Sequence, residues 1–388
     1  MTIGYEFPVS ISLSEVQELI KDNPNFILVE KDDYIVANYV RSGNDTHPLV
    51  VDRATAILRE LRGLVFHPVY GTVISRRYHK FFNFGEREDL MELDLSIPHR
   101  FLEKLDGSMI APIALGYSFR LGTKMGITDV AMQAEEFVAT HPNYNEFIQL
   151  HIERLQTPIF EWCSRKQRIV VDYPEDRLVL TAIRNDITGQ YVSWEQMRTY
   201  ADSYDIDMVQ SIDMTNKSPE EVIQDVRAWE TSEGVVYRRN DGHMMKIKAD
   251  SYVALHRAKS LLDNERDVVG LILDEKTDDL MPLLNADDKE RLLNFKIAVW
   301  NDIDDVFHQC NDLLFHVSAL EMTRKDFALF SKHTNPVIRA LCFAGFDKKS
   351  ITDNDVVNYV KKNLGSGSAF ERARNVLQTA RWCYNERS

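Results

Sequence analysis

A lysine surrounded by the residue types of a covalent nucleophile stands at position 104, in the segment Glu103-Lys104-Leu105-Asp106-Gly107-Ser108. A lysine amine attacks an electrophile such as phosphorus only when it is unprotonated, whereas an ordinary lysine carries a proton at neutral pH. Desolvation or neighbouring positive charge lowers the pKa of a lysine toward the range that this chemistry needs. A motif this short also arises by chance, so the prediction of a nucleophilic Lys104 depends on the rest of the chain.

Two further lysines, Lys246 and Lys248, end an apolar run with the composition of a strand. Side chains alternate along a strand, so both lysines are expected on the same face. There they would lower the pKa of a nearby lysine and neutralise a phosphate group. An edge strand that carries lysines to discourage aggregation has the same pattern, and both interpretations stay open at this point.

Two glutamates are candidates for polar or metal contacts. Glu233 precedes Gly234 at the predicted entrance of a strand, where its carboxylate could hold a magnesium ion directly or through water; an ordinary turn residue is the alternative. Glu161 lies between Phe160 and Trp162. Burying a carboxylate in an aromatic run is costly unless it meets a hydroxyl, a cation or a metal, which favours a functional role.

Two basic positions upstream complete the set. Arg62 and Gly63 precede a predicted strand, and the missing side chain of the glycine would let backbone or ligand come close. Lys80 leads into Phe81-Phe82, a combination that suits a phosphate beside a stacked base. Surface cations followed by core aromatics are the alternative in both cases.

The chemistry-bearing residues are distributed over two kinds of predicted structure. Short apolar or β-branched runs broken by Gly, Pro, Asn or Asp predict strands up to about residue 249, with a helix before Pro24 and a hairpin turn at Asp241-Gly242. Beyond residue 252, apolar residues repeat at helical spacing, as in residues 288–300. The sequence predicts an α+β domain with antiparallel sheets over residues 1–250 and an all-α C-terminal domain over residues 251–388.

Composition limits the classes of protein. No apolar run approaches the roughly twenty residues that cross a bilayer, and the N-terminus lacks the features of a signal peptide, so we expect a cytoplasmic protein with no membrane partner. Its four cysteines, Cys163, Cys310, Cys342 and Cys383, are far apart and are expected to be reduced, buried thiols. The net charge of −14 argues against a nucleic-acid partner, but residues 321–388 hold twelve Lys or Arg against seven Asp or Glu. A local basic face or a solvated mixed-charge surface fits that distribution.

Taken in order, these motifs resemble those of covalent nucleotidyltransferases, and most closely the bacteriophage tRNA-repair RNA ligases of the RNA ligase 1 type. The motifs are Arg62-Gly63, Lys80-Phe81-Phe82-Asn83, Glu103 to Ser108, Phe160-Glu161, Glu233-Gly234 and Lys246-Ile247-Lys248. The likeness continues through residues 249–264 and 278–280 and weakens over the last hundred or so residues. It implies an ATP-grasp-like adenylyltransferase fold for the N-terminal domain.

The resemblance also implies an activity: ATP-dependent joining of RNA ends in three steps. Lys104 would take AMP from ATP, pass it to an RNA 5′-phosphate, and a 3′-hydroxyl would then displace it. By the same likeness, Lys246 and Lys248 hold the α-phosphate, Arg62 and Lys80 the sugar and outer phosphates, and Glu161 the ribose. Further implied nucleotide-binding positions are Tyr39, Phe82, Glu103, Asp106, Gly107, Lys124 and Tyr252, and implied ligands of Mg²⁺ or Mn²⁺ are Glu233 and Asp278.

The implied partner is RNA, namely a tRNA broken in its anticodon loop, acted on by a monomer in the cytoplasm, that of the host if the chain is phage-encoded. Basic residues of the C-terminal domain, Lys348, Lys349, Lys361, Lys362, Arg372 and Arg374, are expected to contact the tRNA phosphates. DNA ligases and RNA capping enzymes share the lysyl-nucleotide chemistry, but a small β-barrel usually follows their K-x-K motif, where this chain turns helical. A non-catalytic tRNA-binding relative is the third alternative.

Overall fold

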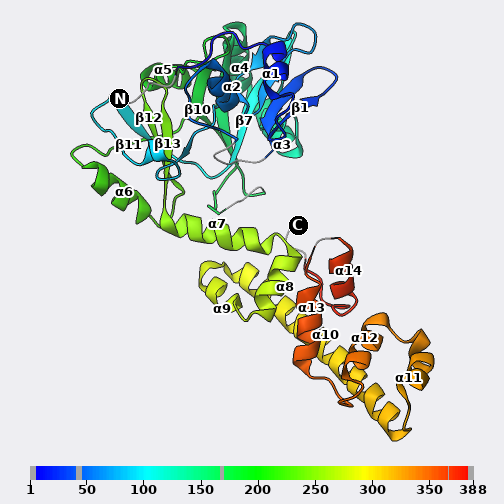
Figure 1. The fold of residues 1–388 in the computed structure, drawn as a ribbon. Helices are drawn as coiled ribbons and strands as arrows, with labels where there is room; N and C mark the ends of the chain where they lie inside the picture. Colours follow the sequence, from blue (N-terminus) through cyan, green and yellow to red (C-terminus); the bar gives the residue numbers. More distant parts are fainter. Residues whose placement is uncertain (1–5, 41–45, 167–169, 366, 383–388) are drawn as a thin grey trace. The chain divides into compact units, whose positions relative to one another are not determined.

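The computed structural model describes residues 6–40, 46–166, 170–365 and 367–382. The chain divides into two compact units, Met1–Val253 and Ala254–Ser388 (Figure 1). In the described ranges, the first unit contains the strands and the second consists of helices and turns. No helix within these ranges is long and apolar enough to span a membrane.

The first unit alternates strands with short helices. Its strands are β1 (Phe26–Glu30), β2 (Ile35–Tyr39), β3 (Leu64–Phe66), β4 (Val73–Ser75), β5 (Phe82–Asn83), β6 (His99–Glu103), β7 (Ser108–Leu115), β8 (Ser118–Gly122), β9 (Gln156–Cys163), β10 (Arg177–Asn185), β11 (Ser211–Ile212), β12 (Gly234–Arg239) and β13 (Met244–Lys248). Its helices are α1 (Leu13–Ile20), α2 (Arg53–Glu60), η1 (Glu88–Leu90), α3 (Asp129–Thr140), α4 (Pro142–Glu153), α5 (Trp194–Tyr204) and α6 (Pro219–Arg227). Helix α7 (Asp250–Leu262) begins in this unit and continues into the second.

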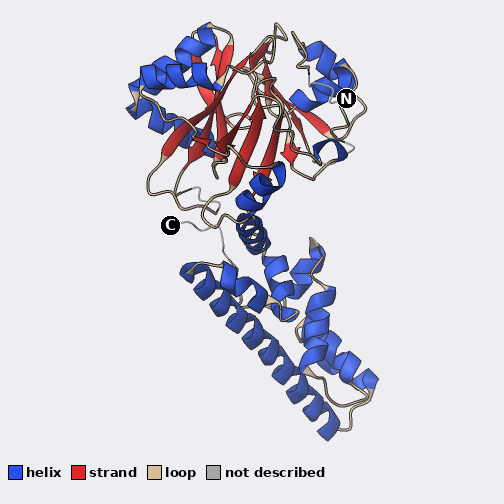
Figure 2. Ribbon diagram, turned by 90° about the vertical axis from the view of Figure 1, so that its left-hand side faces the viewer, coloured by secondary structure: helices blue, strands red, loops and turns tan. Residues whose placement is uncertain are grey.

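Over the described residues, the strands form three sheets with the orders β1-β2-β3-β4, β10-β9-β7-β8 and β11-β6-β12-β13-β5. Figure 2 shows the strands in the middle of the unit and helices on their outer sides. Neighbouring strands in these sheets are antiparallel except β13 and β5, which are parallel and pair Met245 with Phe82 and Lys246 with Asn83. The predicted α+β class with antiparallel sheets is confirmed, and the short parallel pair is an addition that the sequence did not indicate.

The sheet with the order β10-β9-β7-β8 is stabilised by helices α3 and α4, which cover its apolar face. Ile110, Phe147 and Phe160 are fully buried in this core, and burial of each such side chain contributes about 1.5–3 kcal/mol. In β10, the register shifts between Leu180 and Ala182, which leaves Thr181 as an unpaired residue. A bulge of this kind re-aims a side chain, and Thr181 lies at the wall of the cavity described below.

The second unit is helical, as predicted. After α7, its helices are α8 (Glu265–Leu273), α9 (Thr277–Leu280), η2 (Met281–Leu283), α10 (Ala286–Ala319), α11 (Arg324–Phe330), η3 (Ser331–His333), α12 (Pro336–Gly345), α13 (Asp353–Lys362) and α14 (Ser368–Arg374). Along α10, Leu292, Phe295 and Val299 are buried three and four residues apart, the spacing of one helix face. The buried carboxylate of Asp302 accepts hydrogen bonds from the backbone of Thr379 and Ala380, which fixes the segment after α14.

Three cysteines are buried and free, namely Cys163, Cys310 and Cys342, as predicted. The prediction for Cys383 lies outside the described residues.

Candidate active site

The segment that carries Lys104 is a short connection between β6 and β7. Lys104 donates its backbone N–H to the carbonyl of Gly234 at 2.9 Å, which ties the connection to the start of β12. At Gly107, an added Cβ would stand 2.3 Å from the carbonyl oxygen of Trp162 in β9. Only glycine lets the connection approach β9 this closely, so packing explains why the motif has a glycine at position 107.

The Lys104 amine forms an ion pair with Glu233 where the end of β6 lies beside the start of β12. Lys104 Nζ lies 2.7 Å from Glu233 Oε2, and Lys248 Nζ lies 2.9 Å from Glu233 Oε1. The carboxylate is 5% exposed, so its charge is balanced by these two lysines more than by water. Gly234 makes the arrangement possible, since at φ +137° an added Cβ would stand 2.1 Å from the carbonyl oxygen of Ile247.

Asp106 is buried and has a full set of hydrogen bonds within the protein. Its Oδ2 accepts the backbone N–H groups of Val170 and Val171, each at 2.7 Å, and its Oδ1 accepts the hydroxyl of Tyr252 at 2.7 Å. Its own N–H donates to the hydroxyl of Tyr173 at 2.9 Å. Asp106 and Tyr252, both predicted as nucleotide contacts, therefore lie together and hold the loop after β9 against the Lys104 segment.

A cavity of about 240 Å³ lies beside Lys104. Among the predicted site residues, its walls contain Arg62, Glu103, Lys104, Gly107, Glu161 and Lys246. Phe81, which the sequence pointed to together with Phe82, also lines it, as do Tyr78, Thr181 and Arg238, which sequence reasoning did not single out. Tyr39, Lys80, Phe82, Asp106, Lys124, Glu233, Lys248 and Tyr252 are not part of this wall.

Of the adjacent rings of Phe81 and Phe82, only one lines the cavity. Phe81 lines it, and Lys246 Nζ lies 4.9 Å from the centre of the Phe81 ring. Phe82 is 2% exposed on the opposite side, with Lys80 Nζ 5.0 Å from its ring centre. Alternation along a strand places the two rings on opposite sides, but it does not say which of them faces the cavity.

Two groups at the cavity have strongly shifted pKa values. Burial lowers the pKa of Lys246 well below its ordinary value, and the positive charges of Arg62 and Lys104 add to this effect. Burial raises the pKa of Glu161 to about 7, against the opposing influence of Lys104. A cavity that holds both an easily neutralised lysine and an easily protonated glutamate is typical of sites that handle charge during a reaction.

Further cations gather around Tyr39, at the end of β2. Lys80 Nζ and Lys124 Nζ lie 5.3 Å and 4.9 Å from the centre of its ring. Burial favours a higher pKa for Tyr39, but the charges of Arg62, Lys80 and Lys124 outweigh it, and the pKa is lowered. Gly63 brings Arg62 to this group, because at φ +79° an added Cβ would stand 2.7 Å from the Lys124 Cα.

The two predicted metal ligands lie in different units. Glu233 is in the first unit and paired with lysines, whereas Asp278 is in the second, 86% exposed and 3.8 Å from Lys296 Nζ. Among the residues that the structure describes, no group of three His, Cys, Asp or Glu is arranged to hold a metal ion. Magnesium commonly takes only one or two carboxylates together with substrate phosphates, and the buried oxygens of Glu233 suit that mode.

Comparison with known proteins finds similarity to RNA ligases. The family model described as RNA ligase matches residues 60–252, the stretch that contains the cavity. A putative RNA ligase of Thermovibrio ammonificans is 26% identical over 304 residues, which cover 76% of this chain and 77% of that protein. RNA ligase 1 of bacteriophage TS2126 is 29% identical over 147 residues, 34% of this chain and 36% of the phage protein.

Other similarities are more distant or cover less of the relative. A putative bifunctional polynucleotide kinase/RNA ligase of Autographa californica nuclear polyhedrosis virus is 27% identical, and the match covers 76% of this chain but 43% of the viral protein. A solved archaeal ATP-dependent RNA ligase superposes with a TM-score of 0.43 at 17% identity, over 65% of this chain and 68% of the archaeal chain, which is too weak to support an argument about function. Over residues 60–252 the chain is thus similar to the RNA ligase family, and its relatives in sequence include a bacteriophage RNA ligase 1.

Proposed function

We propose that this chain is an ATP-dependent RNA ligase that works through AMP bound covalently to Lys104. Once Lys104 has lost a proton to solvent, its amine attacks the α-phosphorus of ATP, a P–N bond forms, and the bond to the pyrophosphate leaving group breaks. An oxygen of an RNA 5′-phosphate then attacks the same phosphorus and releases the lysine. Finally, an RNA 3′-hydroxyl attacks the activated 5′-phosphate, loses its proton, and displaces AMP as the new phosphodiester forms.

One observation carries the proposal: Lys104 lies at a cavity of about 240 Å³ that three further cations line together with Glu103 and Glu161. Arg62, Arg238 and Lys246 line the same cavity. Phosphoryl transfer is accelerated mostly by positioning and by neutralisation of the charge that develops on phosphate oxygens. The overall charge of −14 is no objection, because only this part of the protein has to be positive.

The remaining predicted residues have roles in the same proposal. Lys246 and Lys248 neutralise the α-phosphate, Arg62 and Lys80 bind the sugar and outer phosphates, and Glu161 binds the ribose. Tyr39 and Lys124 contact the nucleotide, whereas the buried ring of Phe82 packs against Lys80 instead of reaching the cavity. Glu103, Asp106, Gly107 and Tyr252 fix the Lys104 segment against which the nucleotide binds. Support for these roles comes from the shared neighbourhood of Arg62, Tyr39, Lys80 and Lys124 described above.

A divalent cation, Mg²⁺ or Mn²⁺, is part of the proposal as a neutraliser of phosphate charge. Glu233, in the first unit, is the first candidate ligand of this cation, and Asp278, in the second unit, is the other candidate ligand. Glu233 has both carboxylate oxygens within 3 Å of a lysine amine, 2.7 Å for Lys104 and 2.9 Å for Lys248. The lysines would have to give up one of these contacts when the carboxylate accepts a cation.

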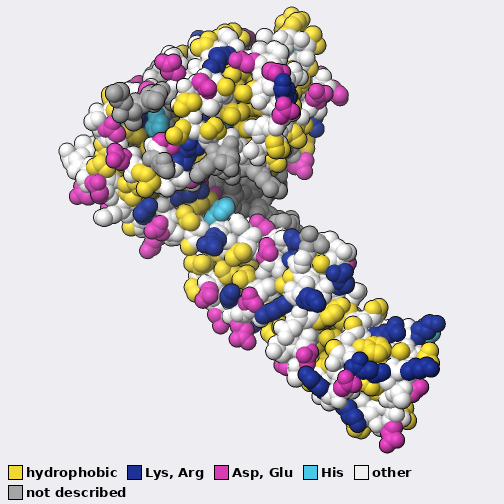
Figure 3. Space-filling view, viewed as in Figure 1, with side chains coloured by type: hydrophobic (Ala, Val, Ile, Leu, Met, Phe, Trp, Pro, Cys, Tyr) yellow, Lys and Arg dark blue, Asp and Glu magenta, His cyan; other side chains and the backbone are white. Residues whose placement is uncertain are grey.

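The proposed substrate is RNA with 5′-phosphate and 3′-hydroxyl ends, in particular a tRNA broken in its anticodon loop. Support in the second unit is limited to exposed cations, which Figure 3 shows gathered over the end that contains α11 and α12. Two of the basic residues predicted from the sequence are engaged elsewhere, because Lys361 pairs with Asp274 and Arg374 with Glu265. Lys348 and Lys349 are exposed and are the better candidates for phosphate contacts.

The test is incubation with α-labelled ATP and magnesium, followed by sealing assays on nicked tRNA anticodon stem-loops and nicked duplex DNA. We expect covalent label on the wild type, weak label with GTP, none on Lys104→Ala, and better sealing of RNA. If Lys104→Ala is labelled as strongly as the wild type, Lys104 is not the nucleophile. If nicked duplex DNA is sealed as well as nicked RNA, the protein is better assigned as a DNA ligase.

A further inference from the structure

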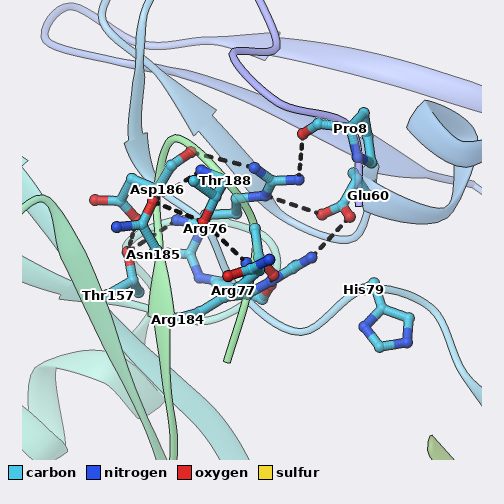
Figure 4. A network of polar contacts seen from close by, with 12 residues as sticks. Pro8, Glu60, Arg76, Arg77, His79, Thr157, Arg184, Asn185, Asp186 and Thr188 are labelled. Atoms are coloured by element: carbon cyan, nitrogen blue, oxygen red, sulfur yellow. Dashed lines mark hydrogen bonds and ion pairs between the residues drawn. The ribbon is translucent and has the colours of Figure 1, made fainter. Parts of the chain in front are cut away.

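A buried network of charged side chains begins two residues before Arg62, which lines the cavity, and includes none of the residues given a role above. Its centre is Glu60, the last residue of α2, whose side chain has no exposed surface. Glu60 Oε2 lies 3.2 Å from Arg76 Nε, and Glu60 Oε1 lies 2.7 Å from Arg184 Nη2 (Figure 4). Both arginine side chains are also fully buried.

The two arginines use their remaining donors on backbone carbonyls from distant parts of the chain. Arg76 donates to the carbonyls of Pro8 at 2.9 Å and Ile187 at 3.1 Å. Arg184 donates to the carbonyl of Gly189 at 2.8 Å and to that of Arg77 at 2.6 Å. Geometry of this kind fixes backbone positions rather than side chains alone.

The network cross-links the two segments that carry Arg62 and Lys80. Glu60 and Arg76 join residues 59–63 to residues 76–80 through side chains. The carbonyl of Arg59 accepts the Lys80 N–H at 2.6 Å, and the carbonyl of Gly63 accepts a hydrogen bond from the Arg77 guanidinium. The segments with the two proposed phosphate-binding cations are therefore held together at three points.

Stability alone is a poor reason for such a network. Replacing a buried ion pair by apolar residues is often neutral or stabilising, whereas removing one partner leaves an uncompensated buried charge. Burial by itself favours a higher pKa for Glu60, but Arg184 and Arg76 outweigh it and lower the pKa, so the residue is a charged carboxylate. The directional hydrogen bonds from both arginines to backbone carbonyls are better explained by a need for fixed geometry at the neighbouring cavity.

We propose that Glu60 is a positioning residue: through Arg76 and Arg184 it fixes Arg62 and Lys80 so that they meet the sugar and phosphates of the incoming nucleotide together. The inference rests on the proposed function for the identity of the ligand. Glu60 does not line the cavity that contains Lys104 and acts only through the two segments. Loss of its charge should weaken nucleotide binding more than the reaction of nucleotide already bound.

The experiment measures ATP binding by calorimetry in the full chain with Lys104→Ala, so that no covalent step intervenes. Adding Glu60→Gln, which keeps the shape of the side chain and removes its charge, is expected to weaken ATP binding about tenfold or more. Glu15→Gln is the matched control, since Glu15 also pairs with an arginine, Arg53 at 2.7 Å, but on the surface. That control should bind ATP as the parent does.

A second variant covers the case in which Glu60→Gln does not fold. Glu60→Asp keeps the charge but is one methylene too short to reach both arginines as Glu60 does, and we expect it to fold and to bind ATP several-fold more weakly. With Lys104 intact, the maximal rate of labelling of the Glu60 variants should stay within about threefold of wild type at saturating ATP. Wild-type ATP affinity in a folded Glu60 variant overturns the inference. Normal ATP binding without any labelling of wild-type protein would overturn the ligase chemistry alone, and no ATP binding by Lys104→Ala would overturn both.

Discussion

Glu233 Oε2 lies 2.7 Å from Lys104 Nζ, so the proposed nucleophile and the proposed metal ligand are each other's partner in the protein without substrate. The same carboxylate lies 2.9 Å from Lys248 Nζ. Nucleotide phosphates would take over the role of this carboxylate as counter-charge to both lysines. On the proposed function, nucleotide binding therefore replaces the Glu233 carboxylate by phosphate as the counter-charge of Lys104 and Lys248.

Glu233→Gln tests that exchange. Without the carboxylate, the Lys104 and Lys248 ammonium groups lack their counter-charge, and an anion should replace it. In EDTA, pyrophosphate is expected to raise the unfolding temperature of the variant more than that of wild type, by about 2–4 °C for each kcal/mol of additional binding energy. An equal effect of pyrophosphate on both proteins in differential scanning fluorimetry would contradict the exchange.

Gly107→Ala tests the close approach of the Lys104 segment to β9. The added Cβ would stand 2.3 Å from the Trp162 carbonyl oxygen, so the segment or the strand must move. We expect a loss of about 1–3 kcal/mol in the free energy of unfolding and a strong loss of labelling by α-labelled ATP. Gly270→Ala is the control, because its Cβ would meet nothing nearer than 3.7 Å; in this helical position alanine should be neutral or stabilising.

Glu161 predicts a pH dependence of stability. Burial, which the charge of Lys104 opposes, raises its pKa from 4.5 to about 7, so between these values the folded protein holds a proton that the unfolded chain has released. The contribution is present below about pH 4.5 and is lost as the pH rises through 7. Denaturant titrations should show wild type losing stability over this window relative to Glu161→Gln; parallel pH profiles would refute the shift.

Lys246 should separate stability from activity. Its pKa is lowered chiefly by burial, so the fold disfavours the charged form of this lysine. Lys246→Met is expected to match or exceed the wild type in unfolding temperature while labelling by ATP falls at least about tenfold. A variant that loses stability and activity in proportion would mean that Lys246 is a structural residue.

Charge reversal in the second unit tests the proposed tRNA contact. Lys348→Glu with Lys349→Glu changes two exposed residues and should weaken tRNA binding while leaving auto-adenylation unchanged. The dependence of binding on salt should also flatten by roughly one unit of logarithmic slope for each phosphate that a lysine no longer neutralises. Lys21→Glu, on the surface of α1 in the first unit, is the control. If the tRNA affinity of the variant and its salt dependence are unaltered, these two lysines of the second unit do not contact tRNA.

Much of the fold followed from local patterns in the sequence. Apolar runs broken by turn residues predicted the sheets of the first unit, and helical spacing beyond residue 252 predicted the second. The helix predicted before Pro24 is α1, and Ser12 caps it, since its hydroxyl accepts the N–H of Glu15. These features depend on neighbours in sequence, which is why pattern reasoning finds them.

The rest depends on contacts between distant residues. Glu60 meets Arg184 across 124 positions, and neither has a local signal that marks it as paired. Phe81 and Phe82 are chemically alike, and only the pairing of β5 with β13 decides which of them faces the cavity. The motif predicted that Asp106 contacts the nucleotide. In the structure its carboxylate accepts hydrogen bonds from Val170, Val171 and Tyr252, so it also has a structural role.

The short ladder between β5 and β13 has a wider consequence. It joins the two strands through only the pairs Met245 with Phe82 and Lys246 with Asn83 in the described residues. Sliding β5 by a single position would turn Phe81 toward the interior and bring Phe82 out beside Lys246. The number of residues between Arg77 and this ladder therefore decides which of the two phenylalanine rings faces the cavity. Insertion or deletion of one residue there would exchange the two rings.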